Sequence, residues 1–289
     1  MMMKRTSVII VTLILILLAG VILLKKQRSQ PMSEMDGGGK SVAEKEKIQQ
    51  FWKYYRLGTR ERLAGKMAAA AAAYRNALDL NHHHEGTLYH LGNVYLELGE
   101  YAKARASWQR LVKINPHSAR AHFQLGNLYM RYDIPEFFNI DSARQEYLRT
   151  LEINQEETGP SLRLGQVALI RGNLTGAQQR FEDVIRTNFK SVEALFLNGY
   201  IAWKEKKQQN ALNLFSLAVK YARIKQPPGK KNAVAGNHTP PRSGTLKNRT
   251  IFQRFLTNLS TLDSTTVSRE MNQRYQALDA FLKEVREKI

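Results

Sequence analysis

The amino-acid sequence predicts an all-α fold, a solenoid of about five stacked helix pairs, and a repeated spacing is the main reason. Four of five units hold a glycine, an alanine twelve residues later and an aromatic four residues after that, with a period near 34 residues, and in the third unit the alanine follows after seventeen residues. A unit of this size cannot bury its own apolar face, so neighbouring units must stack. The pairs that open the units are Leu57-Gly58, Leu91-Gly92, Leu125-Gly126, Leu164-Gly165 and Asn198-Gly199.

Composition agrees with a folded chain and narrows its chemistry. The 289 residues are 43% hydrophobic, enough for a sizeable core. The 44 basic and 25 acidic residues leave a formal charge of +19, which favours contact with anionic surfaces. The chain has no cysteine, and this excludes disulfides, thiolate metal sites and thiol nucleophiles.

The N-terminal region predicts a membrane anchor. After a tail at 1–6, residues 7–24 carry no formal charge and form a stretch about 27 Å long as a helix, close to the thickness of a bilayer core. The alternative is a cleaved signal peptide, but Ala19 and Gly20 are followed by more apolar residues and then lysines. The chain is expected to be a single-pass membrane protein. Because basic residues flank both ends of the apolar stretch, the distribution of charge does not decide its orientation. By analogy with bacterial signal anchors, we expect the soluble domain to be extracytoplasmic. Residues 25–47, with Pro31 and three consecutive glycines, predict a flexible tether.

The solenoid is predicted over 48–225, with repeats near 51–84, 85–118, 119–157, 158–191 and 192–225. The second unit has the most complete pattern, made of Leu91, Gly92, Tyr95, Gly99, Ala104, Trp108 and Pro116. On these residues the chain resembles the tetratricopeptide repeat (TPR) family. The resemblance implies a right-handed superhelix with a concave groove, and a role in binding.

Single units depart from the pattern in informative ways. The first has the run Ala68 to Ala73 in its second helix, which favours helix and tight packing. The fifth has Asn198 in place of leucine and Lys206 in place of the glycine between its helices, so we interpret it as the start of a terminal cap.

The third unit carries five extra residues between its helices. This widened loop is rich in apolar side chains, unusual for a solvated turn. Its members Ile134, Phe137 and Phe138 allow two interpretations: a loop that folds back on its own repeat, which is favoured because most apolar side chains of loops pack locally, or a loop that contacts a partner.

Two segments follow the solenoid. Residues 226–245 are rich in proline and glycine and predict a linker. Residues 246–289 predict a helical cap or association segment, with a stripe at helical spacing. The stripe consists of Val267, Met271, Tyr275, Leu278, Leu282, Val285 and Ile289. It must be covered, either by the end of the solenoid, by a second copy or by a partner.

No residue pattern points to catalysis, a metal or a cofactor. The chain has no glycine-rich phosphate loop, no nucleophile elbow and no pair of metal-binding histidines at helical spacing. The run His82 to His84 lies in a predicted turn, where contiguous imidazoles rarely aim at one ion. We therefore expect no enzyme activity and no cofactor.

The candidate site is a stripe along the first helix of each repeat. By the resemblance, the residue after each glycine faces the groove, where amides can hydrogen-bond a peptide backbone. Aromatic residues stand four positions earlier on the same face. The predicted groove residues are Tyr55, Tyr89, Asn93, Phe123, Asn127, Arg163, Gln166, Phe196 and Tyr200. The alternative is that the stripe packs between helices.

A more specific family feature is only half present. Some members grip a peptide's terminal carboxylate with lysine, arginine and asparagine; Asn93 and Arg163 fit two such positions, but Tyr89 and Gly159 stand at the lysine positions. The resemblance therefore does not imply recognition of a terminal carboxylate.

These observations predict a membrane-anchored TPR scaffold that binds a protein or peptide segment in its groove, in envelope assembly, secretion or respiratory-complex biogenesis. One alternative is that the basic surface or the C-terminal helix binds anionic lipid or nucleic acid, although the dispersed charge argues against nucleic acid. Another is self-association through the C-terminal stripe.

Overall fold

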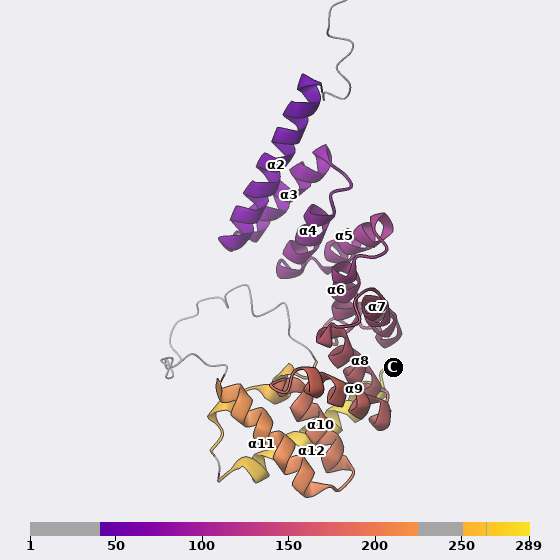
Figure 1. Ribbon diagram of the computed structural model, residues 1–289, viewed down its shortest axis with the longest axis vertical. Helices are drawn as coiled ribbons and strands as arrows, with labels where there is room; N and C mark the ends of the chain where they lie inside the picture. The colour runs from indigo at the N-terminus through magenta and orange to yellow at the C-terminus, as the bar shows by residue number, and fades with distance from the viewer. Residues whose placement is uncertain (1–40, 225–250, 264) are drawn as a thin grey trace, which may run out of the picture. The chain divides into compact units, whose positions relative to one another are not determined.

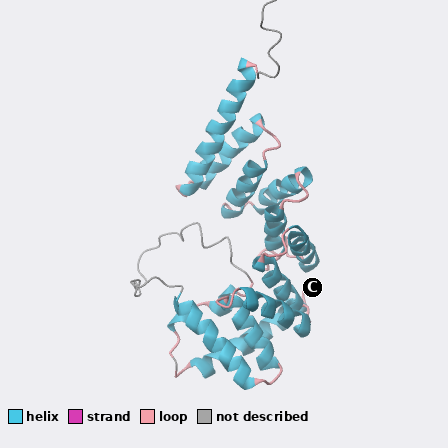
Figure 2. Ribbon diagram, in the orientation of Figure 1, coloured by secondary structure: helices cyan, strands magenta, loops and turns pink. Residues whose placement is uncertain are grey.

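The computed structural model describes residues 41–224, 251–263 and 265–289, and within these ranges the chain forms helices joined by turns, without strands (Figure 2). The chain divides into two units, 1–49 and 50–289. Only residues 41–49 are described in the first unit, and they belong to the start of α2. The predicted linker at 226–245 lies outside the described residues.

Ten consecutive helices form five antiparallel pairs, which confirms the predicted all-helical TPR solenoid (Figure 1). The pairs are α2 (Val42–Leu63) with α3 (Met67–Leu80), α4 (Glu85–Glu97) with α5 (Tyr101–Ile114), α6 (Ala119–Tyr129) with α7 (Ile140–Ile153), α8 (Thr158–Ile170) with α9 (Leu174–Thr187), and α10 (Val192–Lys204) with α11 (Gln208–Ile224). The C-terminal segment adds the short 3₁₀ helices η1 (Gln253–Leu256) and η2 (Leu259–Thr261), and then α12 (Val267–Arg286).

In the first four repeats the repeat glycine lies where the first helix approaches the aromatic of the second, whereas Gly199 of the fifth lies against the Tyr275 hydroxyl of the C-terminal segment. A Cβ atom added at Gly58 would lie 2.7 Å from the Tyr74 ring, and one at Gly165 would lie 2.6 Å from Phe181. Any larger residue would push the two helices apart. The repeated glycine and aromatic therefore set the contact within each of the first four pairs.

The turn between the helices of the fifth repeat keeps the family geometry without a glycine. Gly65, Gly99 and Gly172 have positive φ in the corresponding turns, and Lys206 adopts φ of 62° at the same place. Left-handed backbone costs a non-glycine residue about 1 kcal/mol or more. The departure seen in the sequence thus changes the energy of the turn and not its shape.

α2 begins earlier than the solenoid was predicted to begin. Its first residue is Val42, within the segment 25–47 predicted as a tether. Residues 42–57 contain no glycine or proline and most of them are good helix formers of mixed charge, so nothing ends the helix near residue 48.

The widened loop of the third repeat folds back on the chain. Phe137 is 5% exposed and packs beside Tyr101 and Arg105 of the second repeat. Phe138 contacts Tyr132, and Ile134 is partly buried against the N-terminal core. The apolar side chains of the loop thus pack within the molecule, as expected for a loop that folds back.

α12 joins the core of the last repeats. Its stripe residues Met271, Tyr275, Leu278, Leu282 and Val285 are each at most 2% exposed, whereas Ile289 is 61% exposed. They belong to one hydrophobic cluster with residues of α7 to α11, while a separate cluster spans α3 to α6 and Phe137. The stripe predicted as a cap or association surface is therefore covered by the chain itself.

The predicted membrane localisation is wrong on the described residues. In 41–224, 251–263 and 265–289 no helix combines the length and the hydrophobicity that crossing a bilayer requires. These helices are amphipathic, and even the 20-residue α12 carries charged residues along its solvent face. The predicted anchor at 7–24 lies outside the described residues.

Candidate functional site

The predicted groove residues fall into two regions that the structure treats differently. We define the open face as the stripe on α2, α4 and α6, which consists of Tyr55, Thr59, Tyr89, Asn93, Phe123 and Asn127. We define the covered face as Phe196 and Tyr200 of α10 together with the ends of α8 and α10 that contact α12. Arg163 and Gln166 of α8 lie between the two.

The aromatic side chains of the open face are partly accessible. Tyr55, Tyr89 and Phe123 are each half-buried. Tyr89 accepts a long hydrogen bond of 3.5 Å from Gln124, and the guanidinium of Arg120 lies 6.0 Å from its ring. The three rings thus offer apolar surface with a polar edge, a composition suited to binding a peptide.

The polar residues of the open face are held by neighbouring hydroxyl groups. The Thr59 hydroxyl lies 3.1 Å from the Tyr74 hydroxyl, and the side-chain oxygen of Asn127 accepts a hydrogen bond of 3.0 Å from Tyr147. Asn93 is 6% exposed, and its side-chain oxygen has no hydrogen-bond partner among the described residues. A buried acceptor without a donor is costly, which makes this amide the group on the face that gains most from a ligand donor.

The residues of α8 are already engaged with each other and with α10. Gln166 is fully buried and donates to Glu193 at 2.7 Å, and Arg163 donates to both Gln166 and Glu193 at 3.0 and 3.4 Å. The predicted pair Arg163 and Gln166 therefore closes a network across α8 and α10. While these hydrogen bonds are formed, Arg163 and Gln166 mark the edge of the open face and offer few groups to a ligand.

α12 occupies the covered face. Tyr200 is 1% exposed and donates to Asp279 at 2.7 Å, while the Phe196 ring lies 5.1 Å from the Tyr275 ring. The Tyr275 hydroxyl donates to the Phe196 carbonyl at 3.1 Å, and burial raises the pKa of Tyr275. Two of the nine predicted groove residues are thus unavailable to a ligand while α12 is in place.

The second half of α12 extends this cover toward the third and fourth repeats. Arg286 donates to the carbonyls of Leu169 and Ile170 at the C-terminal end of α8. Tyr132, from the widened loop, packs 5.5 Å from the Phe281 ring and donates to Glu284 at 2.8 Å. The widened loop of the third repeat therefore supplies a docking point for α12.

Sequence reasoning missed two further residues near the open face. His84 caps the N-terminus of α4, since its Nδ1 accepts from the Thr87 backbone at 3.1 Å, and its ring contacts Phe51 and Tyr55. Burial lowers the pKa of His84. Its position just before an acidic helix start was the available signal, because capping residues stand there, although histidine is an uncommon cap.

His122 supports α6 from its opposite side. Its Nδ1 lies 2.6 Å from Glu146 of α7, and its Nε2 lies 3.0 Å from the Pro116 carbonyl. The hydrogen bond with Glu146 is the main cause of a raised pKa for His122. Nothing in the repeat pattern marked this position.

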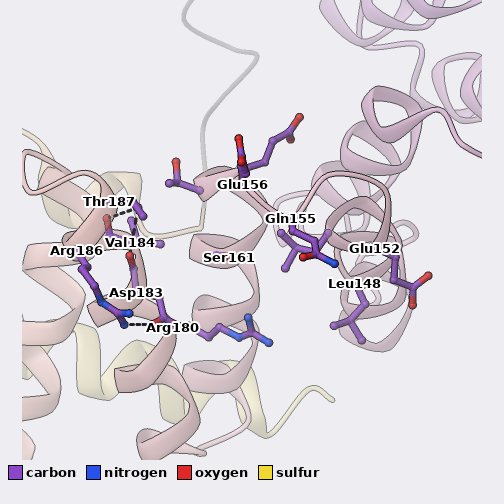
Figure 3. A pocket seen from close by; sticks show the side chains of 13 residues that line it. Leu148, Glu152, Gln155, Glu156, Ser161, Arg180, Asp183, Val184, Arg186 and Thr187 are labelled. Atoms are coloured by element: carbon purple, nitrogen blue, oxygen red, sulfur yellow. Dashed lines mark hydrogen bonds and ion pairs between the residues drawn. The ribbon is translucent and has the colours of Figure 1, made fainter.

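A separate hollow of about 590 Å³ lies on the side of the second helices, between α7, the start of α8, and α9 (Figure 3). Figure 3 shows the Arg180 side chain extending from α9 toward the wall that holds Leu148 and Glu152. Asp183 and Arg186 form an ion pair along its α9 edge. The lining mixes both charges and is open, so it does not define a specific ligand.

Comparison with known proteins supports the repeat assignment. Residues 92–132 match a family model described as TPR repeat, and residues 162–227 match one described as tetratricopeptide repeat. TPR repeats are therefore confirmed in these two stretches. No curated protein matches the sequence.

Solved structures share the fold at low identity. PilF from Pseudomonas aeruginosa is 18% identical, and the match covers 81% of this chain and 98% of PilF with a TM-score of 0.55. MamA from Desulfovibrio magneticus RS-1 is 13% identical, with coverage of 62% and 98% and a TM-score of 0.54. PilW, described as a widely conserved type IV pilus biogenesis factor, is 14% identical, with coverage of 62% and 80% and a TM-score of 0.53. At these identities the likeness shows the fold.

Proposed function

We propose that this chain is a TPR scaffold that binds a segment of a partner protein on the open face of α2, α4 and α6. The supporting observation is the contrast along one stripe: Tyr89 and Phe123 stay partly accessible, while the corresponding Phe196 is fully buried under α12. Surface of this kind, with aromatic rings beside an unsatisfied amide, is typical of peptide recognition.

Binding of a partner is the general role of TPR solenoids, and the fold shared with PilF and PilW is consistent with it. PilW is described as a biogenesis factor of type IV pili, and by analogy we propose that this chain serves in the assembly of a larger protein complex. Its contribution to that process would be to hold one component through the open face.

The proposal can be tested by crosslinking in cells followed by mass spectrometry. The test variant carries Tyr89→Ala, Phe123→Ala and Asn127→Ala. The control carries Leu148→Ala and Leu151→Ala, at partly buried positions that line the hollow between α7, α8 and α9. We expect the native chain and the control to capture the same partner and the test variant to lose it.

A folded test variant that captures the partner as well as the native chain does would contradict the proposal. Thermal unfolding of each variant supplies the check on folding. A set of partners lost equally from both variants would also count against the open face, because it would indicate a general loss of structure.

The alternative of self-association through the C-terminal stripe loses its basis in the structure. Five of the seven stripe residues, Met271, Tyr275, Leu278, Leu282 and Val285, are already buried within this chain. We therefore do not carry it forward as a second function.

A further inference from the structure

Arginine side chains accompany the aromatic residues of the open face. The Arg120 guanidinium lies 6.0 Å from the ring of Tyr89. Arg62 is close enough to Tyr55 for its charge to lower the pKa of that hydroxyl, against the larger effect of burial. The Nε of Arg62 is buried and has no hydrogen-bond partner among the described residues. Tyr55 of α2 and Tyr89 of α4 thus each have a cation nearby.

The neighbouring cation of α8, Arg163, differs from these two arginines because it forms an ion pair. Arg163 is paired with Glu193, so its charge is largely neutralised within the chain. Glu97 is the acidic residue that helical spacing places on the open face, four positions after Asn93. Arg62 and Arg120 are therefore the cations that lie beside the tyrosines of this face.

The covered face shows what chemistry this surface accepts. Asp279 of α12 takes a hydrogen bond of 2.7 Å from Tyr200 and an ion pair of 2.8 Å from Lys204. Burial opposes ionisation of Asp279, but these two donors outweigh it and lower its pKa. Four residues earlier on α12, Tyr275 inserts its ring beside Phe196. Within the chain, α12 therefore covers Phe196 and Tyr200 with one aromatic ring, that of Tyr275, and one carboxylate, that of Asp279.

We infer that the open face selects a partner segment that is acidic and carries an aromatic or large apolar anchor. The inference rests on the proposed function and specifies the chemistry of its ligand. Tyrosine and arginine are the residues most often found at the centres of binding energy in interfaces, where they bury apolar area and pair with charge. The anchor would pack on Tyr89 and Phe123, and the carboxylates would pair with Arg62 and Arg120.

Two fluorescent peptides test the charge preference at constant aromatic content. Both derive from residues 270–284 of this chain, which include Tyr275 and Phe281. The acidic peptide carries Arg274→Glu and Lys283→Glu, which leaves five carboxylates and no basic side chain. The basic peptide carries Glu270→Gln, Asp279→Asn and Glu284→Gln, which leaves two basic side chains and no carboxylate. Their binding to the full chain is measured by fluorescence anisotropy at two salt concentrations.

We expect the acidic peptide to bind at least about tenfold more tightly, with a preference that shrinks as salt rises. In the chain with Arg62→Gln and Arg120→Gln, most of this preference should disappear. The matched control, Arg75→Gln with Arg144→Gln, removes the same net charge from exposed positions on α3 and α7 and should keep it. A third variant, Glu97→Gln, should strengthen binding of the acidic peptide.

Equal affinity of the two peptides would overturn the inference and leave the groove assignment intact, since that assignment is tested separately by partner capture. Equal losses in the test and control pairs would also overturn it, because the preference would then reflect net charge alone. Arg120→Gln by itself guards against misfolding, since this side chain is exposed, and it should reduce the preference in part.

Discussion

The N-terminal and C-terminal halves of this solenoid carry the same stripe of residues and use it differently. In α4 and α6 the stripe residues Tyr89 and Phe123 stay partly accessible, whereas in α10 Phe196 and Tyr200 are buried under α12. The repeat pattern is the same in both halves, so the difference arises from a helix that lies about 70 to 80 residues further along the chain. A repeat motif therefore specifies a surface, and the rest of the chain decides whether that surface is available.

The largest predicted effect comes from removing the ring at the centre of the covered face. Tyr275→Ala should destabilise the C-terminal half by about 3 to 5 kcal/mol, because it leaves a cavity where a fully buried aromatic stood. Hydrogen exchange should then rise in α10 and α11 and stay unchanged in α4 and α5, which belong to a different cluster.

Tyr275→Phe is the matched control for this prediction. It keeps the ring and loses only the hydrogen bond to the Phe196 carbonyl, so a loss of about 1 kcal/mol is expected. If Tyr275→Ala cost no more than Tyr275→Phe, the ring would not hold α12 to the last repeats.

A smaller effect is expected at the far end of α12. Arg286→Ala should cost about 1 to 2 kcal/mol, since it removes two hydrogen bonds to carbonyls at the C-terminus of α8 and a favourable charge there. Lys283→Ala on the same helix, whose side chain is 68% exposed, should change stability by less than about 0.5 kcal/mol. Urea denaturation of the two variants gives the comparison, and equal losses would contradict the assigned role of Arg286.

The smallest predicted effects concern the pH dependence of stability. The two histidines of the N-terminal half act near neutral pH, whereas Asp279 of the C-terminal segment acts only in acid. The pKa of His84 is lowered, so its contribution is present above pH 6.5, the ordinary histidine value, and is lost as pH falls through the folded pKa. The pKa of His122 is raised, so its contribution is complete below pH 6.5 and is lost as pH rises through the folded pKa. The lowered pKa of Asp279 confines the response of the covered face to acid, below the ordinary carboxyl value of 3.8.

Variants can resolve these opposing histidine effects. In His84→Asn, an asparagine can keep the cap while removing the titration, and stability should no longer decline below pH 6.5. In His122→Gln the decline on the alkaline side should vanish. Thermal unfolding across pH 5 to 8 measures both, and curves that keep the native shape in both variants would show that other groups dominate.

Much of the fold could be predicted from spacing alone. In the first four units the repeat glycine and the aromatic of the second helix do meet, as Gly58 meets Tyr74. Local pattern suffices here because the contact lies within one repeat. The stripe of α12 could likewise be predicted as a face that must be buried, since its helical period is visible in the sequence.

The surface that α12 covers could not be predicted in the same way. Its docking depends on contacts such as Tyr200 with Asp279 and Tyr132 with Glu284, which join residues 79 and 152 positions apart. No periodicity reports such pairs. For the same reason the sequence left a partner contact open for the widened loop, although Phe137 and Phe138 pack within the chain.

The absence of cysteine in this chain allows one direct test of the central claim, that the stripe is open over α4 and covered over α10. Single cysteines are introduced as Tyr89→Cys and Tyr200→Cys, and their reaction with a thiol reagent is followed in the folded protein. The account predicts that the cysteine at position 89 reacts at least about a hundredfold faster, because the one at position 200 must wait for α12 to open. Comparable rates in two folded variants would contradict the account, since both halves of the stripe would then be equally accessible.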